Sequence, residues 1–427
     1  MIFAFFFFLL EGISSYLLRE IAWFAINMDA ISLIIVMLNI VVLSIILGKY
    51  ARTKKEYLIL WVAFAARVIV MLLDVYVPEI KINIHSGYDT AGYHNDAVRI
   101  LLSNNEVSIT GNLYAYLLSL IYRMFGAQII MAEYFNILLA MWAIVLLKDI
   151  LYKLPINQKS RMIGFIIMAL GPNYILLSPI MLRETVIIFL LTASLWSFIQ
   201  WWNKRGLIYI SHAITLSIIG AMFHSGAIAA AIAYGLIVTF YDQERNFFKI
   251  DFKTIIMGAV ITLCFTIVSY TMGDMIFTKF QRVNDIMDIG QEAAYAEGGS
   301  AYLDNQTSES IPELIFNTPI RIMYFIGSPV PWKWRGINDI FAFLFSTSIY
   351  LCSIIYLAKA LRLNGKNKNL IIMLLIMALL SATIFAWGVS NAGTALRHRE
   401  KFISVYIVML ALCINETMSS FDKKSLV

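Results

Sequence analysis

The chain has 427 residues, of which 60 % are hydrophobic and 14 % are charged, and its formal net charge is +6. The mean hydropathy of +0.76 predicts a polytopic membrane protein. No stretch is long and polar enough for a separate soluble domain, so we expect residues 1–427 to form a single transmembrane domain. The positive charge does not indicate a nucleic-acid partner, because Lys and Arg are concentrated in short loops, as the positive-inside rule expects.

Apolar stretches of about twenty residues, long enough to cross a hydrocarbon core as helices, recur along the chain. Eleven are clear, and residues 1–25 would add a twelfth crossing despite Glu11, Arg19 and Glu20. The eleven cover residues 30–48, 57–78, 128–149, 161–180, 183–201, 206–223, 225–241, 254–274, 338–360, 369–389 and 402–416. The predicted fold class is therefore all-α, an integral membrane protein with about 11–12 transmembrane helices.

Basic residues alternate between the loops that join these stretches. If the basic loop at 49–55 is cytoplasmic, alternation places every other basic loop on the same side. Those loops are 148–161, 204–205, 245–253, 359–368 and 423–424. The loops 79–111, 275–335 and 390–401 then face outward. Such agreement among six basic loops is hard to obtain by accident.

Two further apolar stretches must not be full crossings, or every later loop would change sides. Residues 113–125 are short for a crossing, and residues 311–332 contain four prolines. Both stretches lie in the two longest outer loops. We therefore expect re-entrant or interfacial segments there, forming a cap over a cavity.

The first outer loop, 79–111, contains a short amphipathic pattern. From Thr90 onward apolar residues recur at helical spacing, which predicts an extracytoplasmic helix that lies along the membrane surface. His94 belongs to this helix, and Asp89 precedes it near the N-cap position. Asp89 either caps the helix or presents a carboxylate at the mouth of a cavity, as a base or a metal ligand.

Other polar clusters lie on the same predicted side. Arg183 and Glu184 are adjacent at a predicted tight turn. Either they form an ordinary ion pair, or the planar guanidinium group of Arg183 binds a phosphate or carboxylate. His224 lies between two apolar helices, where a lone histidine is more often structural than catalytic. The large outer loop, 275–335, is rich in Asp, Glu, Gly and Tyr and ends at Arg335.

The last outer segment carries a basic cluster that opposes the positive-inside rule. Arg397, His398, Arg399 and Lys401 lie within a dozen residues, just before the final helix. A run of charged residues usually forms a surface exposed to solvent, but this run lies on the predicted side where basic residues are disfavoured. Binding an anionic group would explain it.

These motifs carry a family resemblance that spans roughly residues 85–410. The order Leu-Arg183-Glu-Thr, Phe-His224-Ser-Gly and Gly-Thr-Ala-Leu-Arg397-His-Arg399 resembles bacterial exopolysaccharide and O-antigen (Wzy-type) polymerases, including EpsG-like proteins. The acidic outer loop, the surface helix and the segment Gly-Asn-Leu-Tyr-Ala-Tyr-Leu-Leu before Gly126 resemble the GT-C superfamily of glycosyltransferases that use lipid-linked sugars. It is the order and the sidedness of the motifs together that carry the resemblance.

The resemblance implies an enzyme of a bacterial inner membrane whose active site faces outward. Its substrate would be an oligosaccharide on undecaprenyl diphosphate, and its partners a flippase and a chain-length regulator in the same bilayer. The family's acidic residue would correspond to Asp89, and its phosphate-binding residues to Arg183, His224, Arg397 and Arg399. No Asp-x-Asp or Glu-Asp pair is present at Asp89, which argues against a divalent metal there, and we expect no cofactor.

Catalytic roles are accordingly assigned to Asp89, His224 and Glu184. Substrate binding is assigned to Arg183, Arg397, His398, Arg399, His94 and Arg335. Two alternatives stay open: a GT-C transferase that moves one sugar from a polyprenyl-phosphate donor, and a flippase or transporter of lipid-linked oligosaccharides. A transporter would more often show paired halves and polar groups at the midplane.

Overall fold

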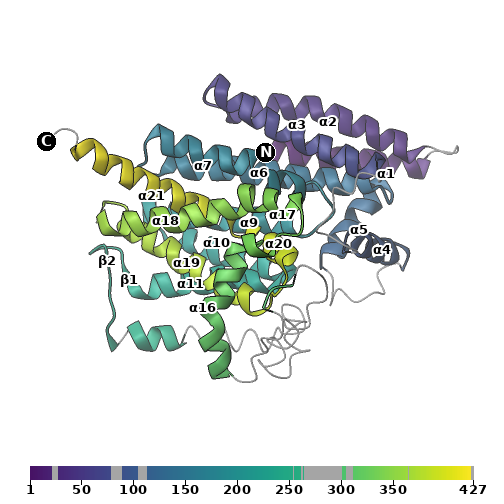
Figure 1. The fold of residues 1–427 in the computed structure, drawn as a ribbon. Helices are drawn as coiled ribbons and strands as arrows, with labels where there is room; N and C mark the ends of the chain where they lie inside the picture. The colour runs from purple at the N-terminus through teal and green to yellow at the C-terminus, as the bar shows by residue number, and fades with distance from the viewer. Residues whose placement is uncertain are drawn as a thin grey trace. The chain divides into compact units, whose positions relative to one another are not determined.

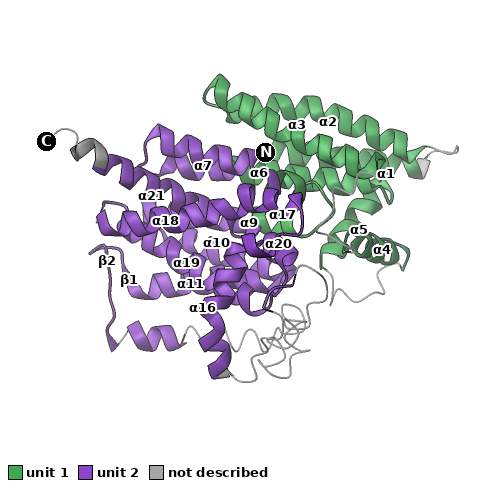
Figure 2. Ribbon diagram, in the orientation of Figure 1, with its two compact units in different colours: residues 1–145, 174–189 green, residues 146–173, 190–427 purple. Residues whose placement is uncertain are grey.

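Figure 1 shows the computed structural model of the chain, which is almost entirely helical. It describes residues 1–21, 27–77, 89–103, 113–252, 254–260, 263, 301–303, 311–363 and 365–424. Within that part, nine helical segments are long and apolar enough to cross a membrane by length and composition. The chain is therefore an all-α polytopic membrane protein, as the sequence predicts. It divides into two compact units, which Figure 2 colours separately.

Unit 1 comprises residues 1–145 and 174–189. Its helices are α1 (Ile2–Ile21), α2 (Met28–Tyr50), α3 (Lys54–Tyr76), α4 (Asp89–Leu102) and α5 (Leu113–Phe125), with most of α6 (Ile129–Lys153), most of α8 (Pro172–Leu177) and the start of α9 (Glu184–Lys204). Helix α1 packs against α2 and α5, α2 against α3, and α4 against α5.

Local sequence explains where α3 begins. Thr53 is its N-cap residue, and the Thr53 Oγ1 atom accepts a hydrogen bond from the Glu56 backbone N–H at 3.2 Å. The Glu56 carboxylate reaches back and accepts from the Arg52 backbone N–H at 2.9 Å. These two bonds satisfy donors that a helix start otherwise leaves unpaired, in the manner of a capping box. The loop at 49–55 is thereby closed tightly between α2 and α3.

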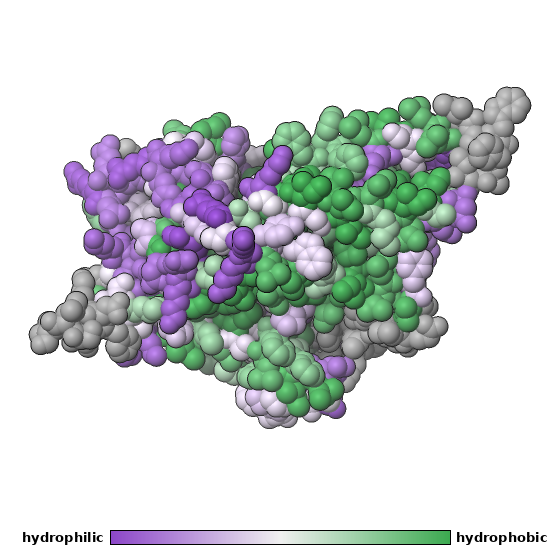
Figure 3. All heavy atoms as spheres, turned by 90° about the horizontal axis from the view of Figure 1, so that it is seen from above, coloured by the Kyte–Doolittle hydropathy of each residue, from purple (hydrophilic) through white to green (hydrophobic). Residues whose placement is uncertain are grey.

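Helix α2 shows how these helices meet lipid. Ile34, Leu38, Val41 and Ile45 follow one face of α2, and each is between 54 % and 64 % exposed. A row of large apolar side chains on an outward helix face is stable in hydrocarbon and costly in water. Figure 3 shows a broad hydrophobic surface of this kind, with hydrophilic residues gathered toward the left of the view.

Unit 2 comprises residues 146–173 and 190–427. Besides the ends of α6 and α9, its elements are α7 (Gln158–Leu170), α10 (Leu207–Phe223), η1 (Ser225–Ala227), α11 (Ile228–Phe240), β1 (Tyr241–Asp242), β2 (Phe247–Phe248), α16 (Ile311–Gly327), η2 (Pro331–Lys333), α17 (Ile337–Ala342), η3 (Phe343–Thr347), α18 (Ser348–Leu363), α19 (Lys368–Trp387), α20 (Ala392–Glu400) and α21 (Ile403–Lys424). Helix α21 packs against α7, α18 and α19, and α19 also packs against α11 and α16. Strands β1 and β2 pair as an antiparallel hairpin.

The basic loops of unit 2 are joined at one end of its helices. The Asn415 side chain near the end of α21 accepts from the Asn157 backbone N–H at 2.8 Å, and the Asn367 side chain donates to Glu416 at 2.6 Å. The Asn369 side chain donates to the Asn246 carbonyl of the β1–β2 turn at 2.7 Å. These contacts bring the loops around 157, 246 and 367 together, as alternation of the predicted spans requires. Which side of a membrane this end faces stays a prediction.

Most predicted spans agree with a helix to within a few residues. Two segments need separate mention. Residues 311–327 form one continuous helix with Pro319 inside it, so the prolines do not break the first 17 residues of the predicted interrupted segment. Helix α5 has 13 residues, which leaves it shorter than the about 20 needed for a full crossing. The predicted span 254–274 lies mainly outside the described residues.

Candidate functional site

Helix α4 begins at Asp89, so Asp89 occupies its first turn instead of preceding it as predicted. The Asp89 side chain is exposed. His94, one turn further, shares a hydrogen bond of 2.8 Å between its Nδ1 atom and the Tyr122 hydroxyl of α5. The Tyr122 hydroxyl donates in turn to the Met181 sulfur at 3.3 Å. The helix that carries Asp89 is thus linked through α5 to the turn before α9.

That turn is held in place from two directions. The Asn136 side chain of α6 donates to the carbonyl oxygens of Ile180 and Leu182, at 2.6 and 3.2 Å. Tyr93 of α4 packs against the apolar cluster of Leu177, Ile180 and Leu182. Within unit 1, α4 and the Arg183 turn therefore belong to one packed cluster. This is the first pair of predicted site segments that the structure brings together.

Arg183 is the basic residue best placed for an anionic ligand in unit 1. Its side chain is partly buried, and its Nε atom is buried without a hydrogen-bond partner among the described residues. No ion pair of Arg183 with Glu184 is found in the described part of the chain. A guanidinium with spare donors can bind a phosphate or carboxylate through its planar fork.

Glu184, which the sequence analysis assigns to catalysis, is buried, whereas a catalytic base is expected to be accessible to the substrate. It is only 1 % exposed, as the first residue of α9. A side chain this deeply buried is less accessible to a sugar hydroxyl than the exposed Asp89. We therefore retain Asp89, which is exposed, as the candidate base of unit 1.

In unit 2, His224 and His398 meet although 174 positions separate them in the chain. Their rings lie edge to face with centroids 4.7 Å apart, and both contact Phe385 of α19, at 5.2 and 5.1 Å. The Gly226 backbone N–H donates to the His224 Nδ1 atom at 3.2 Å, which leaves the proton of a neutral imidazole on Nε2. The motif around His224 and the motif around Arg397 are therefore in direct contact through these two histidines.

Gly226 is what allows this packing. A Cβ atom at position 226 would lie 2.5 Å from the Phe385 ring, closer than real Cβ contacts allow. Any larger residue would push Phe385 away from His224. Sequence reasoning noted Gly226 only as a neighbour of His224, and it missed Phe385, which lies in an apolar span and carries no motif. No signal in one sequence would have found it.

The geometry of α20 separates its basic residues. The helix is capped by Asn391, whose side chain accepts from the backbone N–H groups of Gly393 and Thr394 at 2.9 and 3.3 Å. Arg397 and His398 are partly exposed. The Lys401 ammonium lies 5.4 Å from the centre of the Phe385 ring, against the same aromatic side chain that His398 contacts. His398 and Lys401 thus both contact Phe385 near the end of α19.

Arg399 has a different role from the predicted one. It is 2 % exposed and donates to the carbonyl oxygens of Ile326 and Ser328 at 2.7 and 2.6 Å, and to the Thr347 hydroxyl at 2.7 Å. Burial lowers the pKa of its guanidinium. Because these donors bind the protein's own backbone, Arg399 fastens α20 to the end of α16 and is not a ligand for a lipid diphosphate.

Glu400 completes the same buried network. Its carboxylate accepts from the Asn173 side chain at 2.7 Å and from the Ser346 hydroxyl at 3.1 Å. Burial raises the pKa of Glu400. Residues 173, 346–347 and 399–400 therefore meet at the end of unit 2 opposite the basic loops, because α19 and α21 each run from one end to the other.

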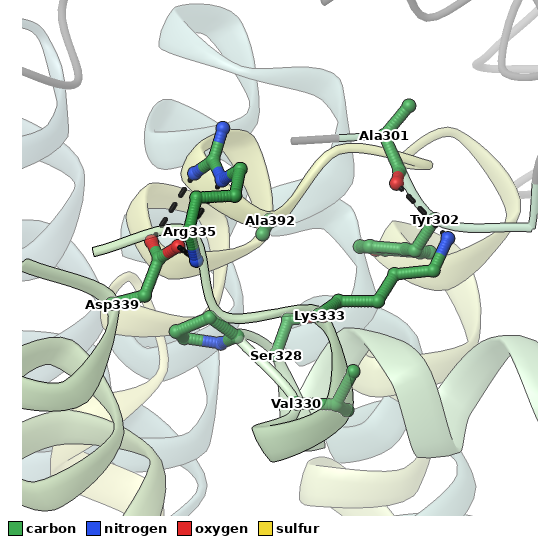
Figure 4. A pocket seen from close by; sticks show the side chains of 9 residues that line it. Ala301, Tyr302, Ser328, Val330, Lys333, Arg335, Asp339 and Ala392 are labelled. Atoms are coloured by element: carbon green, nitrogen blue, oxygen red, sulfur yellow. Dashed lines mark hydrogen bonds and ion pairs between the residues drawn. The ribbon is translucent and has the colours of Figure 1, made fainter. Parts of the chain in front are cut away.

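Arg335, the last predicted ligand, lies between η2 and α17. Its guanidinium forms an ion pair with Asp339 at 3.1 Å (Figure 4), and the Arg335 side chain is 48 % exposed. Within the described ranges, no group of three or more His, Cys, Asp or Glu side chains is arranged to hold a metal ion.

Comparison with known proteins adds no family to this description. No family model matches the chain. No curated protein matches it in sequence, and no solved structure matches it in fold.

Proposed function

We propose that the chain is a membrane glycosyltransferase that polymerises oligosaccharide repeat units carried on undecaprenyl diphosphate at the outer face of a bacterial cytoplasmic membrane. The observation that carries the proposal is the contact of His224 with His398 at the end of unit 2 opposite the basic loops. Ionisable side chains are costly inside a membrane and are tolerated at helix ends, where a cluster of them is a candidate binding site. Here His224 and His398 come from two of the motifs that carry the family resemblance, Phe-His224-Ser-Gly and Gly-Thr-Ala-Leu-Arg397-His-Arg399.

The proposed reaction needs two contributions from the protein's side chains. The first is stabilisation of the diphosphate that leaves, for which Arg397 supplies a guanidinium group without a metal. The second is removal of a proton from the acceptor hydroxyl, which we assign to Asp89. The acceptor oxygen bonds to the anomeric carbon, the bond from that carbon to the diphosphate oxygen breaks, and undecaprenyl diphosphate leaves with the electron pair.

His224 and His398 are assigned to the diphosphate as hydrogen-bond donors. The His224 Nδ1 atom accepts from the Gly226 backbone N–H, so the neutral ring carries its proton on Nε2, the atom from which it would donate. In this account the polyprenyl chain stays in the bilayer while the diphosphate and the sugars lie in water. A flippase that supplies the substrate and a chain-length regulator are the expected partners. A single-sugar GT-C transferase would use the same groups with a smaller acceptor.

One observation favours the competing class, a transporter of lipid-linked oligosaccharides. Asp74 and Glu133 share a side-chain hydrogen bond between α3 and α6, and both helices are candidate membrane spans. Paired ionisable residues inside a membrane often mark an ion pathway. In the same unit the Arg67 guanidinium of α3 donates to the Ser178 hydroxyl at 2.8 Å and lies over the Tyr174 ring.

The saccharide profile of a deletion strain separates these classes. Loss of a polymerase leaves a single repeat unit on the final acceptor, and restoring the intact chain brings back long polymer. Loss of a flippase or of an early transferase removes every repeat unit, which would overturn the proposal. The Arg397→Ala variant should reproduce the single-unit profile at normal protein abundance.

A further inference from the structure

Two acidic residues of unit 1, Asp74 and Glu133, are joined by a hydrogen bond between their side chains. Asp74 lies in the last turn of α3, and Glu133 lies in the second turn of α6. Both positions are near the helix end opposite the basic loops at 49–55 and 148–161. Asp74 is partly buried, and Glu133 is only 1 % exposed. The pair is thus a buried contact between two candidate membrane spans, close to the predicted outer surface.

This hydrogen bond requires a proton on one of the two side chains. An ionised carboxylate has only acceptor oxygens and no hydrogen to donate. Two ionised carboxylates at this distance would repel each other instead of bonding. One carboxyl group must therefore be protonated and donate to the other, so the pair titrates as a unit that holds one proton.

Burial indicates that Glu133 carries the proton. Its carboxyl group accepts a hydrogen bond from the Met181 backbone N–H, and its Oε2 atom is buried without a hydrogen-bond partner among the described residues. A buried ionised carboxylate with an unsatisfied oxygen costs far more free energy than a buried neutral acid. Asp74 is closer to water, which stabilises the negative charge there.

The neighbouring tyrosines do not replace the proton as a source of positive charge. Tyr114 and Tyr122 of α5 interact electrostatically with Glu133, and tyrosine hydroxyls are neutral near pH 7. Ionisable side chains elsewhere on the elements around the start of α6 include Glu11 of α1, Arg67 of α3, His94 of α4, and Arg183 and Glu184 before and at the start of α9. Arg67 donates to Ser178 and His94 is bound to Tyr122, so both are directed to the turn before α9 and to α5.

The turn that carries Arg183 is attached to both helices of the acidic pair. From α3, the Arg67 guanidinium donates to the Ser178 hydroxyl at the start of this turn. From α6, Glu133 accepts from the Met181 backbone N–H in its middle. Loss of the shared proton would place two negative charges against each other in a medium of low dielectric constant, where repulsion is strong. The contact between α3 and α6 would open, and the turn attached to both would loosen.

From these observations we infer that Asp74 and Glu133 form a buried proton-binding site, in which one proton on Glu133 joins α3 to α6 and fixes the turn that carries Arg183. The proton comes from water at the helix ends. Its binding forms the O–H bond of Glu133, and its release returns the electron pair to the carboxylate, so no other reactant is needed. The site rests on the contacts within unit 1 and not on the proposed reaction.

Infrared spectroscopy of the full-length protein in detergent micelles tests whether the proton is present. At about pH 7.5 exposed carboxyl groups are ionised, and the C=O band of a protonated carboxyl is separate from carboxylate bands. We expect a protonated-carboxyl band that is lost in Glu133→Gln. Asp74→Asn should shift the frequency of this band, because its hydrogen bond then goes to an amide. Loss of the band in Asp74→Asn but not in Glu133→Gln, or no band that depends on either residue, overturns the site.

Asp149→Asn is the matched control for these variants. Asp149 is an aspartate of the same helix, 40 % exposed and paired with Lys153 at 3.5 Å. It should be ionised near pH 7.5, so its substitution should leave the protonated-carboxyl band unchanged. Glu133→Gln is a conservative change, because a neutral amide can still donate to Asp74 and accept from Met181.

Hydrogen–deuterium exchange of the peptide that contains residues 178–183 tests the link to the turn. Rates are corrected for the intrinsic exchange rate at each pH. In the parent, protection of this peptide should fall by about tenfold over the pH range in which the infrared band disappears, because roughly one hydrogen bond is lost. In Glu133→Gln, which stays neutral, the protection should not change over that range. Constant protection in the parent while the band disappears, or the same fall in both proteins, overturns the link.

These results are separable from the test of the proposed function. Absence of a band that depends on Glu133 removes the proton-binding site and leaves the deletion-strain result untouched. Conversely, a deletion strain without any repeat unit removes the polymerase, while the infrared band and the exchange result stand.

Discussion

Arg397 and Arg399 lie two positions apart in α20 but in different surroundings. Arg397 is partly exposed, whereas Arg399 is 2 % exposed and donates to Ile326, Ser328 and Thr347. Sequence reasoning treated the two alike, because both belong to one basic motif and a motif does not reveal burial. Burying the charged Arg399 guanidinium costs little free energy only because the protein's own hydrogen-bond acceptors surround it.

Lysine substitution should separate these two roles. Arg399→Lys loses several hydrogen bonds of the fork, so it should lower the free energy of unfolding by on the order of 3 kcal/mol. Arg397→Lys should leave stability near that of the parent while polymer formation falls. Thermal unfolding in detergent and the polymer profile measure the two effects. Equal loss of stability in both variants would contradict the assignment.

Asp89 can be tested by a substitution that separates support of α4 from proton transfer. Asp89 is exposed in the first turn of α4, so Asp89→Asn removes a helix-dipole interaction of only about 0.3–1 kcal/mol and should leave protein abundance unchanged. An amide is not a base, and positioned proton transfer contributes about 10²–10⁴ in rate. We expect polymer formation by purified protein to fall by that order. Activity within about twofold of the parent would remove Asp89 from the mechanism.

His94 gives a pH-dependent prediction. Burial lowers the pKa of His94 in the folded protein, and its ring is bound to Tyr122. Below about pH 6.5 the unfolded chain binds more protons at this residue than the folded chain does, so stability falls as pH falls. Part of the drop in melting temperature between pH 7.5 and 5.5 should disappear in His94→Gln. The exposed His212→Gln is the control, and an equal change in both would show that His94 does not contribute.

At the scale of elements, hydrophobic length predicted the helices well. The predicted spans 30–48 and 369–389 correspond to α2 at 28–50 and α19 at 368–387. Local chemistry explains the ends, as Thr53 does for α3. Of the four prolines of 311–332, Pro312 and Pro319 lie inside α16 without breaking it, and the helix ends at Gly327, before Pro329. Pro312 lies in the first turn of α16, where proline is tolerated, and tertiary packing overrides the cost of Pro319.

The topology of these elements can be measured by cysteine labelling in a background without native cysteines. Asn95 of α4 and Trp332 of η2 are exposed and should react with an impermeant reagent added outside the cell. Gln158 and Glu244, exposed at the basic loops, should react only after the membrane is opened. Ser160 is unsuitable because it is fully buried. Labelling of Gln158 but not Asn95 in intact cells would reverse the orientation.

At the scale of the whole molecule, a single sequence leaves long-range pairing undetermined. The order of motifs suggested that His224 and the Arg397 motif belong together, and the contact of His224 with His398 agrees. Nothing in the sequence pointed to Phe385, because a phenylalanine in an apolar span is common. Its role depends on which helices pack together, and hydrophobic periodicity does not specify that.

The most direct test of the central claim uses the purified chain in liposomes with undecaprenyl diphosphate-linked repeat units. We predict a ladder of polymer on a gel together with release of undecaprenyl diphosphate, and no ladder with Asp89→Asn. Movement of the labelled substrate to the other leaflet without any polymer would contradict the account and assign the chain to lipid-linked oligosaccharide transport.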